Sequence, residues 1–249
     1  MKKILTVIIV FLAVFLIYLG FKDKDIYYLS LGDSLANGVN SYGNNDYGYS
    51  DFIKDYLSSN KKLKNYVNLA NNNKRTIDII KDITDNVKVM VDNKEKTMQN
   101  ALIKAAIITL SIGINDLFSN ITFNNDFGMQ DLYRKFEQVS TDLENLFKLL
   151  REYSKEDIIF IGFYNYLNED ELNDFFLYAN DIIEKIATNY NITYLDVYED
   201  LKDDKYFDDY NCSFPNKLGY EMIANKIISL IDEKIDKKAW FLSFFFVII

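Results

Sequence analysis

The sequence predicts an α/β protein: a single three-layer α/β/α domain on a mainly parallel five-stranded sheet, preceded by a transmembrane helix. Three observations support this class. Apolar segments of strand length alternate about five times with segments of helical periodicity. Two strand segments, residues 105–112 and 158–163, are continuously apolar, as in strands covered on both faces. The amino-terminal run of residues 4–21 carries no charge and approaches the thickness of a bilayer.

The predicted strands and helices follow one another without long linkers, because the chain has only 9 glycines and 1 proline. Strands are expected at residues 26–31, 66–69, 105–112, 158–163 and 192–197. Helices are expected at residues 50–59, 76–91, 129–153, 169–189 and 216–235, and a further helix ends at residues 100–104. The carboxyl ends of parallel strands form one rim, so residues 32–34 and 113–115 are expected to meet there.

The amino-terminal run follows Lys2 and Lys3 and lacks the small-residue cleavage site of a signal peptide, which favours an uncleaved anchor. The two lysines predict a single-pass protein of the cell membrane with its domain outside the cytoplasm. Secretion after cleavage of this segment is the alternative. Three parts are therefore expected: a membrane segment at residues 1–24, a domain at 25–238 and an apolar tail at 239–249.

The tail has 11 residues, too few to span a bilayer as a helix. Three interpretations stay open: a strand or tail packed on the domain, an interfacial membrane contact, and a truncated end.

Composition excludes several classes of function. The formal net charge of -9 disfavours nucleic-acid binding, which needs basic surface. A single cysteine, Cys212, excludes an intramolecular disulfide. The chain has no histidine, and so lacks both the usual general base at neutral pH and the commonest metal ligand. We expect no metal and no cofactor, and the sequence does not indicate an oligomeric state.

Two short motifs carry candidate chemistry. Ser34 follows the first predicted strand in the sequence Gly-Asp-Ser, although a serine there could equally cap a helix. Asn115 follows the third predicted strand in the sequence Gly-Ile-Asn-Asp, although an isolated asparagine is more often a turn residue. Their joint occurrence on one predicted rim favours a functional site.

In order and spacing these motifs resemble the SGNH or GDSL hydrolases over roughly residues 26–235, nearest to the secreted or anchored bacterial lipase-like members. Four segments are similar to the family's blocks: residues 28–35, 68–73, 112–116 and 214–220. The resemblance implies a flavodoxin-like fold and an acyl-ester hydrolase that forms an acyl-enzyme on a serine. It implies Ser34 as the nucleophile, with the oxyanion bound by the N–H groups of Ser34 and Asn73 and by the Asn115 side chain.

The closing segment departs from the family at the catalytic base, which is a histidine oriented by an aspartate three residues earlier. Here Asn211 stands in the aspartate position and Phe214 in the histidine position. Asp208 and Asp209 precede the segment, but a carboxylate with an ordinary pKa is a poor base at neutral pH. Cys212 could replace the nucleophile only with a base or cationic neighbour.

The sequence leaves open whether the chain is an enzyme. One hypothesis is a membrane-anchored serine ester hydrolase by descent, either working at the cell surface with a base other than histidine or with its activity much reduced or lost. The alternative is a pseudoenzyme at the cell surface that binds an acyl ester, lipid or acylated glycan in the same cleft. A third is a decayed family member, as the unusual tail suggests.

Overall fold

The computed structural model describes residues 26–91, 94–118, 128–165, 167, 169–208 and 213–248. Its centre is a five-stranded sheet of β1 (Ile26–Gly32), β2 (Leu63–Asn68), β5 (Ile107–Ser111), β6 (Asp157–Ile161) and β7 (Thr193–Leu195). The helices are α2 (Tyr49–Ser59), α3 (Thr76–Thr84), α4 (Met98–Lys104), α5 (Ile114–Phe118), α6 (Met129–Tyr153), α7 (Asn173–Asn189) and α8 (Lys217–Ile248). Short 3-10 turns lie at Asp170–Leu172, Asp200–Lys202 and Asp204–Tyr206. A hairpin of β3 (Lys88–Val91) and β4 (Lys94–Thr97) completes the description.

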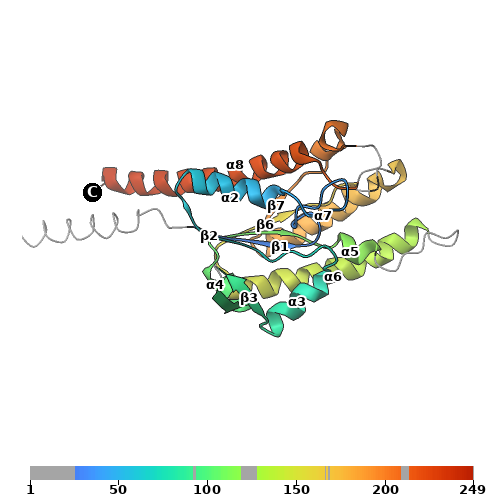
Figure 1. The fold of residues 1–249 in the computed structure, drawn as a ribbon, viewed down its shortest axis with the longest axis horizontal. Helices are drawn as coiled ribbons and strands as arrows, with labels where there is room; N and C mark the ends of the chain where they lie inside the picture. The colour runs from blue at the N-terminus through green and yellow to red at the C-terminus, as the bar shows by residue number, and fades with distance from the viewer. Residues whose placement is uncertain are drawn as a thin grey trace, which may run out of the picture.

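The sheet separates two layers of helices, as Figure 1 shows with α2 and α8 above it and α3 and α6 below it. On the first face, Ile53 of α2 and Ile223 of α8 belong to the same buried cluster as Tyr28 of β1. On the second face, α3, α4, α6 and α7 cover the strands, with Phe136 and Phe147 of α6 fully buried. The predicted three-layer arrangement is therefore confirmed.

All four strand pairings in the sheet are parallel, and the order is β2-β1-β5-β6-β7. The chain moves outward from β1 in both directions, so the order reverses between β1 and β5. Ligand sites of open α/β sheets lie outside the carboxyl ends of the strands at such a reversal. The two segments expected to meet, residues 32–34 and 113–115, follow these two strands.

The expected helix over residues 76–91 is wrong in its second half, because α3 ends at Thr84 and β3 begins at Lys88. Asn86 adopts a left-handed conformation, with φ 50°. Its N–H donates to Ile83 O, and the Val87 N–H donates to Asp82 O. This pair of hydrogen bonds is a Schellman motif, in which asparagine is tolerated at the left-handed position. The asparagine was a usable stop signal in the sequence.

The last helix is longer than expected. It was predicted at residues 216–235, and α8 continues to Ile248. Residues 239–248 thus extend a helix, and the strand alternative for the tail is not observed. Within the described residues, no helix is both long and apolar enough to cross a membrane. The predicted anchor at residues 4–21 lies outside the described residues.

Asn180 of α7 joins its helix to the end of β6. Its Oδ1 accepts from the Phe163 N–H (2.9 Å) and its Nδ2 donates to Phe163 O (2.8 Å), with only 7% of the residue exposed. Asn180→Leu would leave both backbone groups of Phe163 without a partner, and we expect it to lower the free energy of unfolding by about 2–4 kcal/mol. Urea denaturation measures this effect. Asn189→Leu, on the exposed face of the same helix, is the control; equal losses in the two variants would contradict the prediction.

Candidate active site

Ser34 lies in a tight turn that leaves the carboxyl end of β1. The turn is closed by backbone hydrogen bonds from Asn37 N to Asp33 O (2.9 Å) and from Val39 N to Ser34 O (3.0 Å). Gly32 begins it with φ 137°, and a Cβ at this position would lie 1.9 Å from Ser111 O of β5. Glycine is therefore required where β1 and β5 approach each other at the rim.

Asn115 reaches the same place from β5. Gly113 precedes it with φ 117°, and a Cβ there would lie 2.8 Å from the Phe163 ring. The Asn115 Nδ2 donates to Asn72 O (3.0 Å) and to Lys74 O (2.8 Å). An asparagine amide has two N–H donors, so both are used within the protein.

The carbonyl oxygen of Asn72 is the point where the site residues meet. It accepts from the Ser34 hydroxyl (2.7 Å) and from Asn115 Nδ2 (3.0 Å). Donors that bind an oxyanion lie about 2.7–3.1 Å from it. The carbonyl oxygen of Asn72 therefore accepts a hydrogen bond from the Asn115 amide, the group that the resemblance assigns to binding a substrate oxyanion.

The Asn73 N–H, expected as an oxyanion donor, has a different orientation. The C=O of Asn72 and the N–H of Asn73 belong to one planar trans peptide and point in opposite directions. Because the carbonyl faces Ser34, the N–H faces away and donates to Asn71 Oδ1 (3.4 Å). The side chain of Asn72 holds this peptide by accepting from Asn37 Nδ2 (2.7 Å) and donating to Asn45 Oδ1 (2.9 Å).

The structure thus brings Ser34, Asn115 and the peptide before Asn73 together, as expected from the sequence, but in a closed arrangement. Of the three expected oxyanion donors, the Asn115 amide is bonded internally and the Asn73 N–H is turned away. The Ser34 N–H has no hydrogen-bond partner within the described residues.

Asp33 is 4% exposed and lies directly under Ser34. Its Oδ1 accepts from the Leu35 N–H and the Ser111 hydroxyl, each at 3.2 Å. Burial raises the pKa of its carboxyl to about 7, opposed by these two hydrogen bonds and assisted by the charge of Asp116. The Asp33 side chain connects the turn to β5, a role that the sequence motif alone did not reveal.

This raised pKa predicts a pH-dependent stability. The folded protein holds the Asp33 proton up to about pH 7, whereas the unfolded chain loses it near pH 4. The folded state therefore binds more protons between these values, and the contribution of Asp33 to stability falls as pH rises through this window. We expect Asp33→Asn to be more stable than wild type at pH 8, by on the order of 3 kcal/mol, and the difference to shrink toward pH 4. Asp85→Asn at an exposed turn is the control; a constant difference across pH would contradict the mechanism.

Asp116 links the segment that carries Asn115 to the start of α3. Its carboxylate accepts from the Thr76 N–H (2.9 Å) and the Thr76 hydroxyl (3.0 Å), at the start of α3. Burial raises the pKa of Asp116, and the bonds from Thr76 oppose this shift. Asp116 thus caps the amino terminus of α3 and connects this helix to the segment that carries Asn115.

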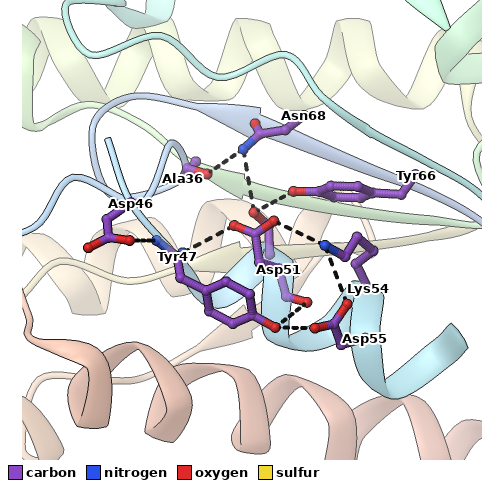
Figure 2. A network of polar contacts seen from close by, with 10 residues as sticks. Ala36, Asp46, Tyr47, Asp51, Lys54, Asp55, Tyr66 and Asn68 are labelled. Carbon is purple, nitrogen blue, oxygen red and sulfur yellow. Dashed lines mark hydrogen bonds and ion pairs between the residues drawn. The ribbon is translucent and has the colours of Figure 1, made fainter. Parts of the chain in front are cut away.

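A polar network secures the other side of the serine turn (Figure 2). Asn68 Nδ2 donates to Ala36 O (3.0 Å) and lies 3.4 Å from Ser50 Oγ, which in turn bonds to the Tyr66 hydroxyl (2.8 Å). These bonds attach Ala36, two residues after Ser34, to Asn68 of β2 and Ser50 of α2. Next to these residues, the Tyr47 hydroxyl donates to the carboxylate of Asp55.

The closing segment packs beside this turn. The Tyr220 hydroxyl of α8 donates to Val39 O (2.7 Å), and the Tyr164 hydroxyl donates to Ser213 O (2.7 Å). Phe214 is half-buried next to this contact. Asp209, Asn211 and Cys212 lie outside the described residues.

Asp208, considered as a substitute base, is exposed and accepts a hydrogen bond from the Ser41 hydroxyl (2.7 Å). Among the described residues, the Ser34 hydroxyl donates to Asn72 O and to no carboxylate. In the same part of the chain, no group of three or more Cys, Asp or Glu side chains is arranged to hold a metal ion.

Ser34 follows β1 and Asn115 lies in α5 directly after β5, so the two side chains meet at the rim where ligand sites of such sheets lie. Residues 30–222 match the GDSL-like lipase/acylhydrolase family, and the chain belongs to this family. No match to a curated protein is found.

Solved structures show the same fold. An acetylxylan esterase from Geobacillus stearothermophilus superposes with a TM-score of 0.61 at 16% identity, covering 83% of this chain and 94% of that one. An α/β hydrolase enzyme from the metagenome of Lake Arreo, Spain, gives 0.58 at 18% identity with the same coverage. Structures of the acetylxylan esterase include catalytic mutants in which a serine, a histidine or an aspartate is replaced by alanine.

Proposed function

We propose that this protein is a membrane-anchored acyl-ester hydrolase by descent, whose turnover at Ser34 is much reduced or lost. The observation that carries the proposal is the bond from the Ser34 hydroxyl to Asn72 O (2.7 Å). A serine becomes nucleophilic when a neighbouring base takes its proton, and an amide carbonyl is not such a base. The protein has no histidine that could serve as this base.

The expected loss can be expressed as a rate. Removing a triad histidine costs about 10⁶ in kcat in subtilisin, and a missing oxyanion donor costs about 10²–10³. A typical enzyme turns over at about 10 per second. Either loss alone brings Ser34-dependent turnover below about 0.1 per second, and both together bring it below any practical background.

The test compares hydrolysis of p-nitrophenyl acetate by the full-length protein and by Ser34→Ala. We expect the two rates to be equal within error. A Ser34-dependent rate above about 0.1 per second would overturn the proposal, because it would require an efficient base other than histidine.

The second candidate function is ligand binding without turnover. It is favoured by the internal bonds of Asn115 to Asn72 O and Lys74 O, which keep the rim ordered without a substrate. The structural relative that is an acetylxylan esterase makes acylated glycans the first class to test, followed by acylated lipids. A ligand that binds only the folded state raises the melting temperature. A shift with an acetylated xylooligosaccharide, and none with its deacetylated form, would support this function; no shift with any acylated ligand would contradict it.

A further inference from the structure

The last helix, α8, runs along the whole height of the sheet and leaves the domain where the strands begin. Near its start, the Tyr220 hydroxyl donates to Val39 O (2.7 Å), beside the serine turn at the rim. Farther along, Lys234 Nζ donates to Asp157 Oδ1 (2.7 Å), and Asp157 is the first residue of β6. This end of the sheet, at which the parallel strands begin, is the amino edge. The helix then continues to Ile248, past the sheet and past α2, as Figure 1 shows.

The chain also enters the domain at the amino edge. The Ile26 N–H of β1 donates to Lys62 O (2.8 Å), directly before β2. Lys62 Nζ in turn lies 3.6 Å from the Asp232 carboxylate of α8. Residues 22–25 span at most about 18 Å, so an anchor in residues 4–21 would leave a bilayer beside the extension of α8. The amino edge is therefore the side of the domain that such an anchor holds next to the membrane.

The extension of α8 matches the layers of a bilayer. Residues 239–248 carry no charge, follow Lys237 and Lys238, and have Trp240 at their start. At about 1.5 Å per residue they span about 15 Å, half of the ~30 Å hydrocarbon core. The helix from Lys234 to the start of this run covers about 7 Å, similar to one headgroup layer of about 5–8 Å. Lysine and tryptophan are the residues that favour this interface.

The run is apolar on all sides of the helix, because Ser243 is the single polar residue among residues 239–248. The packed part of α8 differs, since Glu221, Asn225 and Ser229 give it an exposed polar side. A helix that packs on protein along one side keeps polar residues on the other, whereas a helix that is apolar all round is surrounded by a core or by lipid. A second copy of the chain would cover one side and leave the other in water. Lipid covers all sides, and it is the occupant that this composition favours.

We propose that residues 239–248 of α8 enter one leaflet of the membrane, as a second contact beside the anchor at residues 4–21. The inference rests on the membrane anchoring in the proposed function and deepens it. Two attachments at the amino edge make the domain stand on this edge, whereas an anchor alone would let it tilt about residues 22–25. The rim that carries Ser34 then faces away from the bilayer.

This orientation selects a class of ligand for the rim. From Ile26 to Gly32, β1 spans about 20 Å at roughly 3.3 Å per residue, and Ser34 lies beyond its end. An acyl group held within the bilayer does not reach a serine at this height. The rim therefore meets acyl esters carried by molecules outside the bilayer, of the acylated glycan class, and not the acyl chains of membrane lipids.

Trp240 is the only tryptophan of the chain, so its fluorescence reports on the extension without a label. The full-length protein is reconstituted into phosphatidylcholine vesicles that contain lipids brominated at a defined depth. We expect Trp240 to lose most of its emission to lipids brominated near the headgroup, less to lipids brominated at the chain ends, and little to aqueous iodide. Quenching by iodide but not by lipid would place Trp240 in water and overturn the proposal. Blue-shifted emission that neither agent quenches would place it against protein, such as a second copy, and would overturn the proposal as well.

The double variant Phe244→Asp, Phe245→Asp places two charges within the run. We expect it to lose the quenching by brominated lipids, because charged side chains are costly in the hydrocarbon core. Asn225→Asp, Ser229→Asp adds the same charges to the exposed side of the packed part of α8 and should keep the quenching. Equal loss in both variants would reduce the effect to net charge and overturn the proposal.

Flotation of the same vesicles separates this inference from the anchoring on which it rests. Wild type that floats with the vesicles while Trp240 stays unquenched would overturn the second contact and leave the anchor in place. Wild type that does not float would overturn both. Hydrolysis at Ser34 enters neither measurement.

The orientation is tested by energy transfer from a dye to acceptors on the lipid headgroups. The dye is attached in a Cys212→Ser background to Lys155→Cys, at an exposed position just before β6, or to Tyr42→Cys, in the loop after the serine turn. Tyr42 is 81% exposed. We expect strong transfer from position 155 and weak transfer from position 42, because β1 alone separates the two ends of the sheet by about 20 Å. Equal transfer from both positions would mean that the domain does not stand on its amino edge, and would overturn the proposed orientation.

Discussion

The double variant Asn211→Asp, Phe214→His is expected to hydrolyse p-nitrophenyl acetate at least about 10³-fold faster than wild type, in a manner that depends on Ser34. The substitutions restore the family's base and its orienting carboxylate at the positions where Asn211 and Phe214 stand. A triad histidine raises kcat by a factor of about 10⁶, and a missing oxyanion donor lowers kcat by a factor of about 10²–10³. The expected gain is therefore about 10³–10⁴.

The hydrogen bonds from Ser34 and Asn115 to Asn72 O limit the hydrolysis rate that the double variant can reach. The peptide between Asn72 and Asn73 would have to rotate to aim an N–H at the oxyanion. Adding Asn73→Gly to the double variant frees this rotation, since glycine has no Cβ to restrict it. We expect the triple variant to gain a further ~10-fold or more.

The control for both variants is Ser34→Ala in the same background, which should return hydrolysis to the uncatalysed rate. No gain in either variant would mean that the closing segment does not lie opposite Ser34 as the sequence blocks imply. A gain only in the triple variant would identify the Asn72–Asn73 peptide as the larger obstacle.

Gly32→Ala is expected to destabilise the fold by more than about 3 kcal/mol, or to prevent folding. The new Cβ would lie 1.9 Å from Ser111 O, and this oxygen also accepts from the Asp33 N–H (2.9 Å). Neither backbone can move without breaking the contact between β1 and β5. The steric overlap therefore adds to the backbone strain of an alanine at φ 137°. In a chain of this size the melting temperature should fall by about 10 °C or more.

Gly43→Ala separates the two causes. Gly43 also has a positive φ, 76°, but a Cβ there would have no heavy atom within 4 Å. It should cost about 1–2 kcal/mol from the backbone conformation alone, a fall of about 2–8 °C. Thermal unfolding followed by circular dichroism measures both variants. A Gly32→Ala variant no less stable than Gly43→Ala would show that the contact with β5 can relax.

Local sequence was sufficient to predict most elements of this fold. The helix over residues 129–153 has the predicted bounds, because its apolar side chains recur every three to four positions through a buried face. The buried strands were predicted within a few residues, because both faces are covered and apolar side chains fill them continuously. The β3–β4 hairpin was missed, since Lys94 and Lys96 interrupt the expected alternation of apolar and polar residues.

The candidate site, like the fold, was predicted from the sequence only in part. Chain order and the two glycine motifs were enough to predict that Ser34 and Asn115 meet at one rim, since parallel strands place their carboxyl ends together. The composition likewise showed that the chain has no histidine. Only the tertiary structure decided which side of the Asn72–Asn73 peptide faces the serine, because Asn37 and Asn45 hold Asn72 from other segments of the chain. The orientation of one peptide depends on such distant partners and leaves no periodic signal in the sequence.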